Sequence, residues 1–166
     1  APYFGTPLWK AEAEPLFTTW LNPIQRAIKT GEKNHDYGSP AYKNANEVFY
    51  KNFGVRKTKL TSELDTSTAK GNEFIYNYMW GPTEFTAAGT LINYNRVQNL
   101  KTIKVPTLFI TGEFDEARPV TVKYFQSLVP NSKFVMIDGA GHGTMHDNKG
   151  QNISAVKTFL DSLELK

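Results

Sequence analysis

Two acidic residues and a histidine stand in two short stretches of the second half of the sequence. Asp115 and Glu116 lie in TGEFDEARP, and His142 lies in DGAGHG. A carboxylate that accepts a hydrogen bond from an imidazole holds the ring in one tautomer and stabilises the imidazolium that forms when the ring takes up a proton. Such a pair is the acid and base of acyl transfer through an activated nucleophile, so hydrolysis is the chemistry to test.

Each stretch directly follows an apolar run with the length of a buried strand. The first run, VPTLFITG, spans residues 105–112, and the second, SKFVMIDG, spans 132–139. Residues 119–129 have helical spacing after a proline, and 152–165 have the pattern of an amphipathic helix. The sequence therefore predicts two consecutive β-α units of a doubly wound sheet over residues 100–166.

The carboxyl ends of parallel strands meet at one edge of a sheet, where ligands of such folds bind. We therefore expect Asp115 and His142 to lie within hydrogen-bonding reach of each other. Spacing alone leaves another interpretation open, in which the aspartate is a helix cap or a solvated turn residue and the histidine lies on the surface of a glycine-rich loop.

The last predicted helix has one apolar face, made of Ile153, Val156, Phe159, Leu160 and Leu163. Two strands alone make a poor sheet, because one face and both edges lack partners. We therefore expect part of the fold to lie outside this chain.

The first 99 residues have a different texture, with many Asn, Lys, Thr and aromatic residues and apolar positions at helical spacing. Pro23 and the stretch 30–40 are expected to divide this region into short helices, and 56–72 is expected to be a loop. An aromatic-dense helix then ends at Gly81. We predict a helical region over 1–99 and a β-α-β-α region over 100–166.

Composition excludes several classes of function. The 166 residues are 40% hydrophobic, which is enough for a folded core, and the net charge of +3 comes from 19 basic and 16 acidic residues that are mixed along the chain. We find no basic run for nucleic acid or membranes and no apolar run of about 18 residues. The absence of cysteine excludes disulfides and thiolate metal sites, and it fits a cytoplasmic protein, although any targeting signal would precede Ala1.

We expect neither a metal nor a cofactor. His142 and His146 have the spacing of two metal ligands on a helix, but Gly141 and Gly143 disfavour a helix there and no third ligand is evident.

The strings VPTLFITGEFDEARP and GAGHG resemble the C-terminal part of the α/β-hydrolase fold. With MWGPTEF and GTL upstream, the chain resembles the proline iminopeptidase family, and APYFGTPLWKAEA through SPAYKNANEVFY resembles the helical cap of that family. The resemblance implies an α/β chain: the C-terminal part of a hydrolase sheet with a mostly helical cap subdomain. It also implies that Asp115 and His142 are two members of a catalytic triad.

The third member of such a triad is a serine in G-x-S-x-G. No serine of this chain has that context, and no cysteine can replace it; the serines are Ser39, Ser62, Ser67, Ser127, Ser132, Ser154 and Ser162. The resemblance therefore implies that the nucleophile lies before Ala1, in a missing N-terminal part of the same enzyme, and that the isolated chain is inactive.

The resemblance also implies a serine aminopeptidase that releases an N-terminal residue, most simply proline, from substrates with a free N-terminus. Glu84 and Glu116 are expected to bind the free amine through charge-assisted hydrogen bonds, and Trp80 and Phe85 to line the pocket. Without the resemblance, Glu84 would be a helix first-turn acid and the aromatic residues ordinary packing. The alternatives are an amino-acid amidase or esterase, an epoxide hydrolase on the same fold, and a non-catalytic folded fragment.

Overall fold

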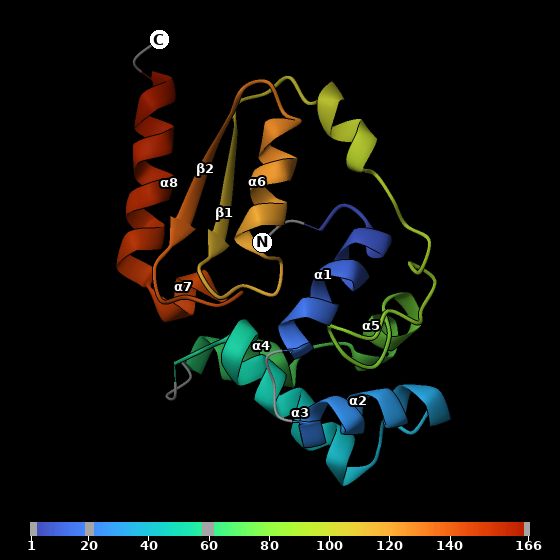
Figure 1. Cartoon of the computed structure of the whole chain (residues 1–166). Helices are drawn as coiled ribbons and strands as arrows, with labels where there is room; N and C mark the ends of the chain where they lie inside the picture. Colours follow the sequence, from blue (N-terminus) through green and yellow to red (C-terminus); the bar gives the residue numbers. More distant parts are fainter. Residues whose placement is uncertain (1–2, 19–21, 58–61, 165–166) are drawn as a thin grey trace.

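The computed structural model describes residues 3–18, 22–57 and 62–164. Most of these residues form helices, and a short parallel sheet lies among them (Figure 1). In chain order the elements are α1 (Thr6–Thr18), α2 (Asn22–Asn34), α3 (Pro40–Phe49), a π-helical turn (Tyr50–Gly54), α4 (Ser62–Ala69), α5 (Glu73–Met79), a 3-10 turn (Val97–Thr102), β1 (Thr107–Gly112), α6 (Pro119–Ser127), β2 (Ser132–Ile137), α7 (Thr144–Asp147) and α8 (Lys149–Glu164). Among the described residues, no helix is long and apolar enough to cross a lipid bilayer.

The sheet has the predicted β-α-β-α connection. β1 and β2 are parallel, and their register runs from Thr107 opposite Ser132 to Gly112 opposite Ile137. α6 and α8 flank the two strands, and the helices α2 to α5 lie beyond the carboxyl ends of both strands (Figure 1). Within the described residues the sheet contains only these two strands, so each strand has one unpaired edge.

The helix α6 covers the sheet because its sequence combines a start signal with one apolar face. Pro119 occupies its first turn, where the missing N–H group costs no hydrogen bond. Val122 and Phe125 are 0% and 3% exposed, and they pack in one cluster with Phe109 of β1. Burial of each such side chain contributes roughly 1.5–3 kcal/mol, so this contact fixes the first strand against its helix.

The apolar face predicted for the last helix is only partly buried. Its helix forms as α8, but it begins at Lys149 rather than at residue 152. Ile153 and Leu160 on this face are 54% and 51% exposed. A two-stranded sheet is too narrow to cover a 16-residue helix, and the stripe remains in solvent.

A second hydrophobic cluster lies in the helical region that follows α1. The hydroxyl of Ser39 caps α3 by accepting a hydrogen bond from the amide of Tyr42 at 3.4 Å. Tyr42, Ala45 and Phe49 follow at helical spacing, and they pack against Phe85 from a distant loop. We call the helices α2 to α5 with this loop the cap.

The first described residues belong to the sheet side of the molecule. The ring of Phe4 lies 5.1 Å from that of Phe125 and 6.4 Å from that of Phe109, measured between ring centroids. Phe4 therefore packs against the β-α-β-α region, and the division at residues 99 and 100 stays a prediction.

Two stretches expected to be loops contain helices. Residues 56–72 include α4, in which no residue is buried, and the loop after β2 includes the four-residue helix α7. Glu63 and Asp65 stabilise the first turn of α4 through the helix dipole. Apolar periodicity arises only where a helix buries one face, so an exposed helix such as α4 lacks the signal on which the prediction relied.

Candidate active site

The carboxylate of Asp115 is fully buried at the end of β1 and is held by four polar groups. Its Oδ1 accepts a hydrogen bond from the amide of Ala117 at 2.9 Å, and its Oδ2 accepts from the hydroxyl of Thr111 at 3.2 Å and the amide of Gly112 at 3.3 Å. The fourth group is the imidazole of His142. The bonds from Ala117, Thr111 and Gly112 fix the carboxylate in place, and Oδ1 also bonds the ring of His142.

His142 lies in the loop after β2, and glycines let this loop return to the end of β1. Gly139 adopts φ +69°, a conformation that L-residues with side chains rarely take. A Cβ atom at Gly112 would collide with the carbonyl oxygens of Ala140 and Gly141, so the strand end and the loop meet at backbone contact. The histidine ring therefore reaches the aspartate across the sheet edge.

The expected pairing of the two side chains is present in the structure. Nδ1 of His142 lies 3.0 Å from Oδ1 of Asp115 and 3.5 Å from Oε1 of Glu116. The side chain of Asp115 is 0% exposed, whereas that of His142 is 41% exposed. With a carboxylate as acceptor, Nδ1 carries the proton and Nε2 carries the lone pair. The ring can thus accept a second proton from a group outside this part of the chain.

Glu116 is an unusual carboxylate because it is buried beside other acids. It is 5% exposed, and its Oε2 has no hydrogen-bond partner among the described residues. Burial raises its pKa to about 9, with further increases from the charges of Glu84 and Asp115. A buried acid in this state favours a proton or an incoming cation as its partner.

The raised pKa makes a prediction about stability. The usual pKa of a glutamate is 4.5, and below this pH Glu116 is protonated in both the folded and the unfolded chain. Between pH 4.5 and about 9, Glu116 is protonated in the folded chain but ionised in the unfolded chain. Stability is therefore lost as pH rises through this window, and Glu116→Gln, which resembles the protonated acid, removes the loss. We expect the melting temperature of the variant minus that of the wild type to increase from pH 5 to pH 9 and then to level off. Thermal unfolding followed by circular dichroism measures both values. The exposed Glu113→Gln should show no such trend, and a difference that is constant across pH would contradict the assignment.

Glu84 lies in a loop that distant residues fix in place. The indole of Trp9 in α1 donates a hydrogen bond to the carbonyl of Glu84 at 2.8 Å. Gly81, at the start of the loop, has φ +144°, and a Cβ atom there would collide with the carbonyl oxygen of Thr86. The hydroxyl of Tyr76 in α5 is hydrogen-bonded to the Glu84 carboxylate. The pKa of Tyr76 is raised mainly by burial and to a smaller extent by the nearby charge of Glu84. The loop therefore presents Glu84 near Glu116 in a defined position.

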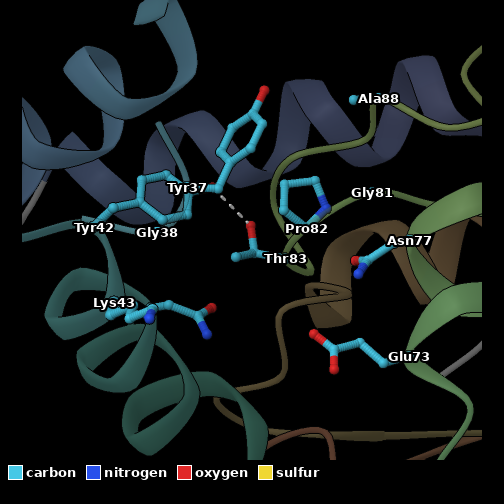
Figure 2. Close-up of a pocket in the computed structure, with 11 residues that line it drawn as sticks. Tyr37, Gly38, Tyr42, Lys43, Glu73, Asn77, Gly81, Pro82, Thr83 and Ala88 are labelled. Atoms are coloured by element: carbon cyan, nitrogen blue, oxygen red, sulfur yellow. Dashed lines mark hydrogen bonds between the residues drawn. The ribbon is translucent and has the colours of Figure 1, made fainter. Parts of the chain in front are cut away.

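A pocket lined by both polar and apolar residues lies within the cap, on the side of the same loop that Thr83 faces. Its volume is about 570 Å³, and Figure 2 shows Lys43 from α3 and Glu73 and Asn77 from α5 at its wall. The hydroxyl of Tyr42 contacts that of Thr83 at 3.1 Å (Figure 2). The lining of this pocket does not include the aspartate, the histidine or either glutamate of the candidate site.

The two aromatic residues expected at the substrate pocket are buried in packing contacts. Trp80 is 8% exposed, and its indole donates to the carbonyl of Thr83 at 2.9 Å. Phe85 is 4% exposed, with its ring 5.0 Å from that of Phe49 between centroids. Both shape the loop that carries Glu84, and direct contact with a substrate stays a prediction for each.

Other expectations concern the serines and His146. Ser127 and Ser162 donate their hydroxyls to carbonyls three residues earlier in α6 and α8, at 2.7 Å each. His146 lies in α7 while His142 precedes that helix, so the two histidines do not share a helical face. Within the described residues, no three His, Cys, Asp or Glu side chains form a group that could hold a metal ion.

Comparisons with known proteins agree with this architecture. No family model matches the chain. A proline iminopeptidase of Heyndrickxia coagulans is 34% identical over 164 residues, which is 98% of this chain and 57% of that protein. A proline iminopeptidase of Lactobacillus helveticus (strain DPC 4571) is 29% identical over 154 residues, which is 93% of this chain and 52% of that protein. The chain thus spans about half the length of the curated relatives it matches.

Two solved structures are similar to nearly the whole chain. The crystal structure of VinJ superposes with a TM-score of 0.89 at 25% identity, over 96% of this chain and 54% of that one. The crystal structure of a proline iminopeptidase from Mycobacterium smegmatis superposes with a TM-score of 0.85 at 26% identity, with the same coverage. The chain therefore has the fold of the C-terminal part of an α/β-hydrolase with a helical cap.

Proposed function

We propose, from the premise that this chain is similar to proline iminopeptidases over nearly all of its length, that it supplies the acid, the base and the cap of a serine aminopeptidase. The enzyme would release an N-terminal residue, most simply proline, from peptides or amino-acid amides. The observation that carries the proposal is the 3.0 Å contact between the buried Asp115 and the half-exposed His142, with Glu116 beside them.

In the proposed mechanism, the two ring nitrogens of His142 have different roles. Nδ1 donates to Asp115, so Nε2 accepts the proton of a serine hydroxyl as that oxygen attacks the carbonyl carbon of the N-terminal residue. The same nitrogen then donates the proton to the leaving amine. Water attacks the acyl-enzyme in a second round, which releases the free residue and restores the serine. Asp115 holds the ring by its hydrogen bond to Nδ1 and stabilises the imidazolium.

The glutamates give the proposed site its preference for a free N-terminus. An ammonium group placed between Glu84 and Glu116 would donate charge-assisted hydrogen bonds to their carboxylates, and the unpartnered Oε2 of Glu116 is available as an acceptor. A bound cation also favours the ionised form of Glu116, whose pKa burial has raised. A blocked N-terminus would leave Glu84 without a counter-charge and would not supply the cation that favours the ionised form of Glu116, so its binding is disfavoured.

The serine is proposed to come from another stretch of polypeptide, most simply the N-terminal part of the same enzyme. The unpaired strand edges and the exposed apolar stripe of α8 give such a part a surface to cover. The chain spans about half the length of the relatives it matches, which supports a partner of comparable length.

The decisive experiment compares the assembled enzyme, isolated in its native state and called the particle below, with the purified 166-residue chain. We expect denaturing mass spectrometry of the particle to reveal a second polypeptide with a G-x-S-x-G serine, and a fluorophosphonate probe to label that polypeptide alone. The particle should cleave proline p-nitroanilide, whereas the isolated chain should not. Turnover by the isolated chain that is lost on His142→Ala would refute the missing nucleophile. A folded chain with neither partner nor turnover would favour a non-catalytic binding module, and cleavage restricted to amides or esters would favour an amidase or esterase.

A further inference from the structure

The carboxylate of Asp147, the last residue of α7, joins two segments that lie far apart in the sequence. Its Oδ2 accepts a hydrogen bond from the amide of Gly141 at 2.8 Å, in the loop that carries the histidine. Its Oδ1 accepts from the amides of Arg56 and Lys57, each at 2.9 Å, about 90 residues earlier, and the Arg56 amide also donates to Oδ2 at 3.1 Å. One side chain thus bonds three backbone groups, from the histidine loop and from the chain after the π-helical turn.

The same two segments also meet directly through their backbones. The amide of His142 donates to the carbonyl of Phe53 at 2.7 Å, and that of Gly143 donates to the carbonyl of Gly54 at 2.9 Å. A Cβ atom at Gly141 would lie 2.5 Å from the carbonyl oxygen of Gly54, so only glycine permits this approach. The backbone position of the histidine is therefore set by the cap as well as by the strand before it.

The cap segment touches the acid loop as well. The guanidinium carbon of Arg56 lies 3.9 Å from the ring centre of Phe114, which directly precedes Asp115. The segment begins with the π-helical turn Tyr50–Gly54, and single π-helical turns occur frequently at functional sites. Residues 50–57 therefore contact both loops that carry the catalytic pair.

We propose that Asp147 is a positioning residue that fixes the His142 loop against the cap and thereby sets the hydrogen bond between His142 and Asp115. A carboxylate has two acceptor oxygens. Here Oδ2 bonds the loop and shares the Arg56 amide, while Oδ1 bonds the chain after the π-helical turn alone. Loss of either oxygen as an acceptor would weaken the connection between the two segments. The inference rests on the proposed function only for its effect on turnover, because the contacts themselves belong to the chain.

The variant Asp147→Asn tests the role, because an amide keeps one acceptor oxygen and replaces the other with a donor. We expect the amide protons of Gly141, His142 and Gly143 to exchange with solvent at least tenfold faster than in wild type, measured by NMR on the 166-residue chain. The amide protons of β1 should be unaffected. The imidazole Nδ1–H signal of His142, bonded to Asp115, should be lost.

A matched control is Asp138→Asn, which changes an exposed aspartate at the end of β2 that accepts only from Gln151 among the hydrogen bonds described for its side chain. It should leave both signals unchanged. If the amide protons of the His142 loop exchange no faster in Asp147→Asn than in wild type, the proposal is wrong. Equally accelerated exchange of the amide protons of β1 would also overturn it, because that result indicates general destabilisation. Should this variant not fold, Asp147→Glu keeps both oxygens but displaces them by one methylene, and the same selective acceleration is then required.

Turnover separates this proposal from the proposed function. In the assembled enzyme, Asp147→Asn should lower kcat at least tenfold while KM changes less than twofold. Selective loop exchange with an unchanged kcat would overturn the positioning role. Selective loop exchange in a particle that lacks any aminopeptidase activity would instead refute the proposed function and leave the positioning of His142 intact.

Discussion

Asp115→Asn is expected to lower the kcat of the assembled enzyme by about 10⁴-fold with little change in KM, the size of the effect when the acid of a Ser-His-Asp triad becomes an amide. The amide NH₂ group must face one of the donors that now surround the carboxylate, namely Ala117, Thr111, Gly112 or His142. The ring then takes the wrong tautomer, and Nε2 no longer carries the lone pair that accepts the serine proton.

The measurement is steady-state cleavage of proline p-nitroanilide by the assembled enzyme over a range of pH. Asp138→Asn provides the matched control, because this aspartate is exposed and lies at the end of the neighbouring strand. It should retain wild-type kcat. A decrease of less than about tenfold for Asp115→Asn in a folded enzyme would show that Asp115 does not orient the base.

The second large effect concerns substrates with free and blocked N-termini. Glu116→Gln and Glu84→Gln should each lower kcat/KM for a free N-terminal proline by about 10- to 100-fold, since a hydrogen bond to a charged group is worth about 1.5–3 kcal/mol. The same variants should leave an N-acetylated substrate unchanged or improve its cleavage. Glu84→Gln removes a charge that a blocked N-terminus leaves unpaired, and Glu116→Gln resembles the protonated acid that is present when no cation is bound.

The informative quantity is the ratio of kcat/KM for the free substrate to that for the acetylated one. Glu113→Gln is the control, because this exposed acid lies three residues before Glu116 and accepts a hydrogen bond from the amide of Gly139 at 2.9 Å, which glutamine can also accept. A ratio that is unchanged in both Glu84→Gln and Glu116→Gln would contradict amine recognition by these acids, even if overall activity fell.

Some features of this protein follow from the local sequence. The apolar runs before Asp115 and His142 predict parallel strands, and Pro119 with the helical spacing after it predicts the helix between them. Once two strands are parallel and adjacent, the residues after each strand must meet at one edge. The proximity of Asp115 and His142 could therefore be predicted from a pattern of about 40 residues, before any tertiary contact was known.

Other features depend on packing between distant parts of the chain. The burial that raises the pKa of Glu116, the contact of Trp9 with Glu84 across 75 residues and that of Asp147 with Arg56 across 91 residues have no local signature. Likewise, the sequence predicts the apolar stripe of α8, whereas the exposure of much of this stripe depends on the two-stranded sheet. Periodicity records which face of an element is apolar, whereas the partner of that face, and the ionisation of an acid beside it, are set only when the elements pack.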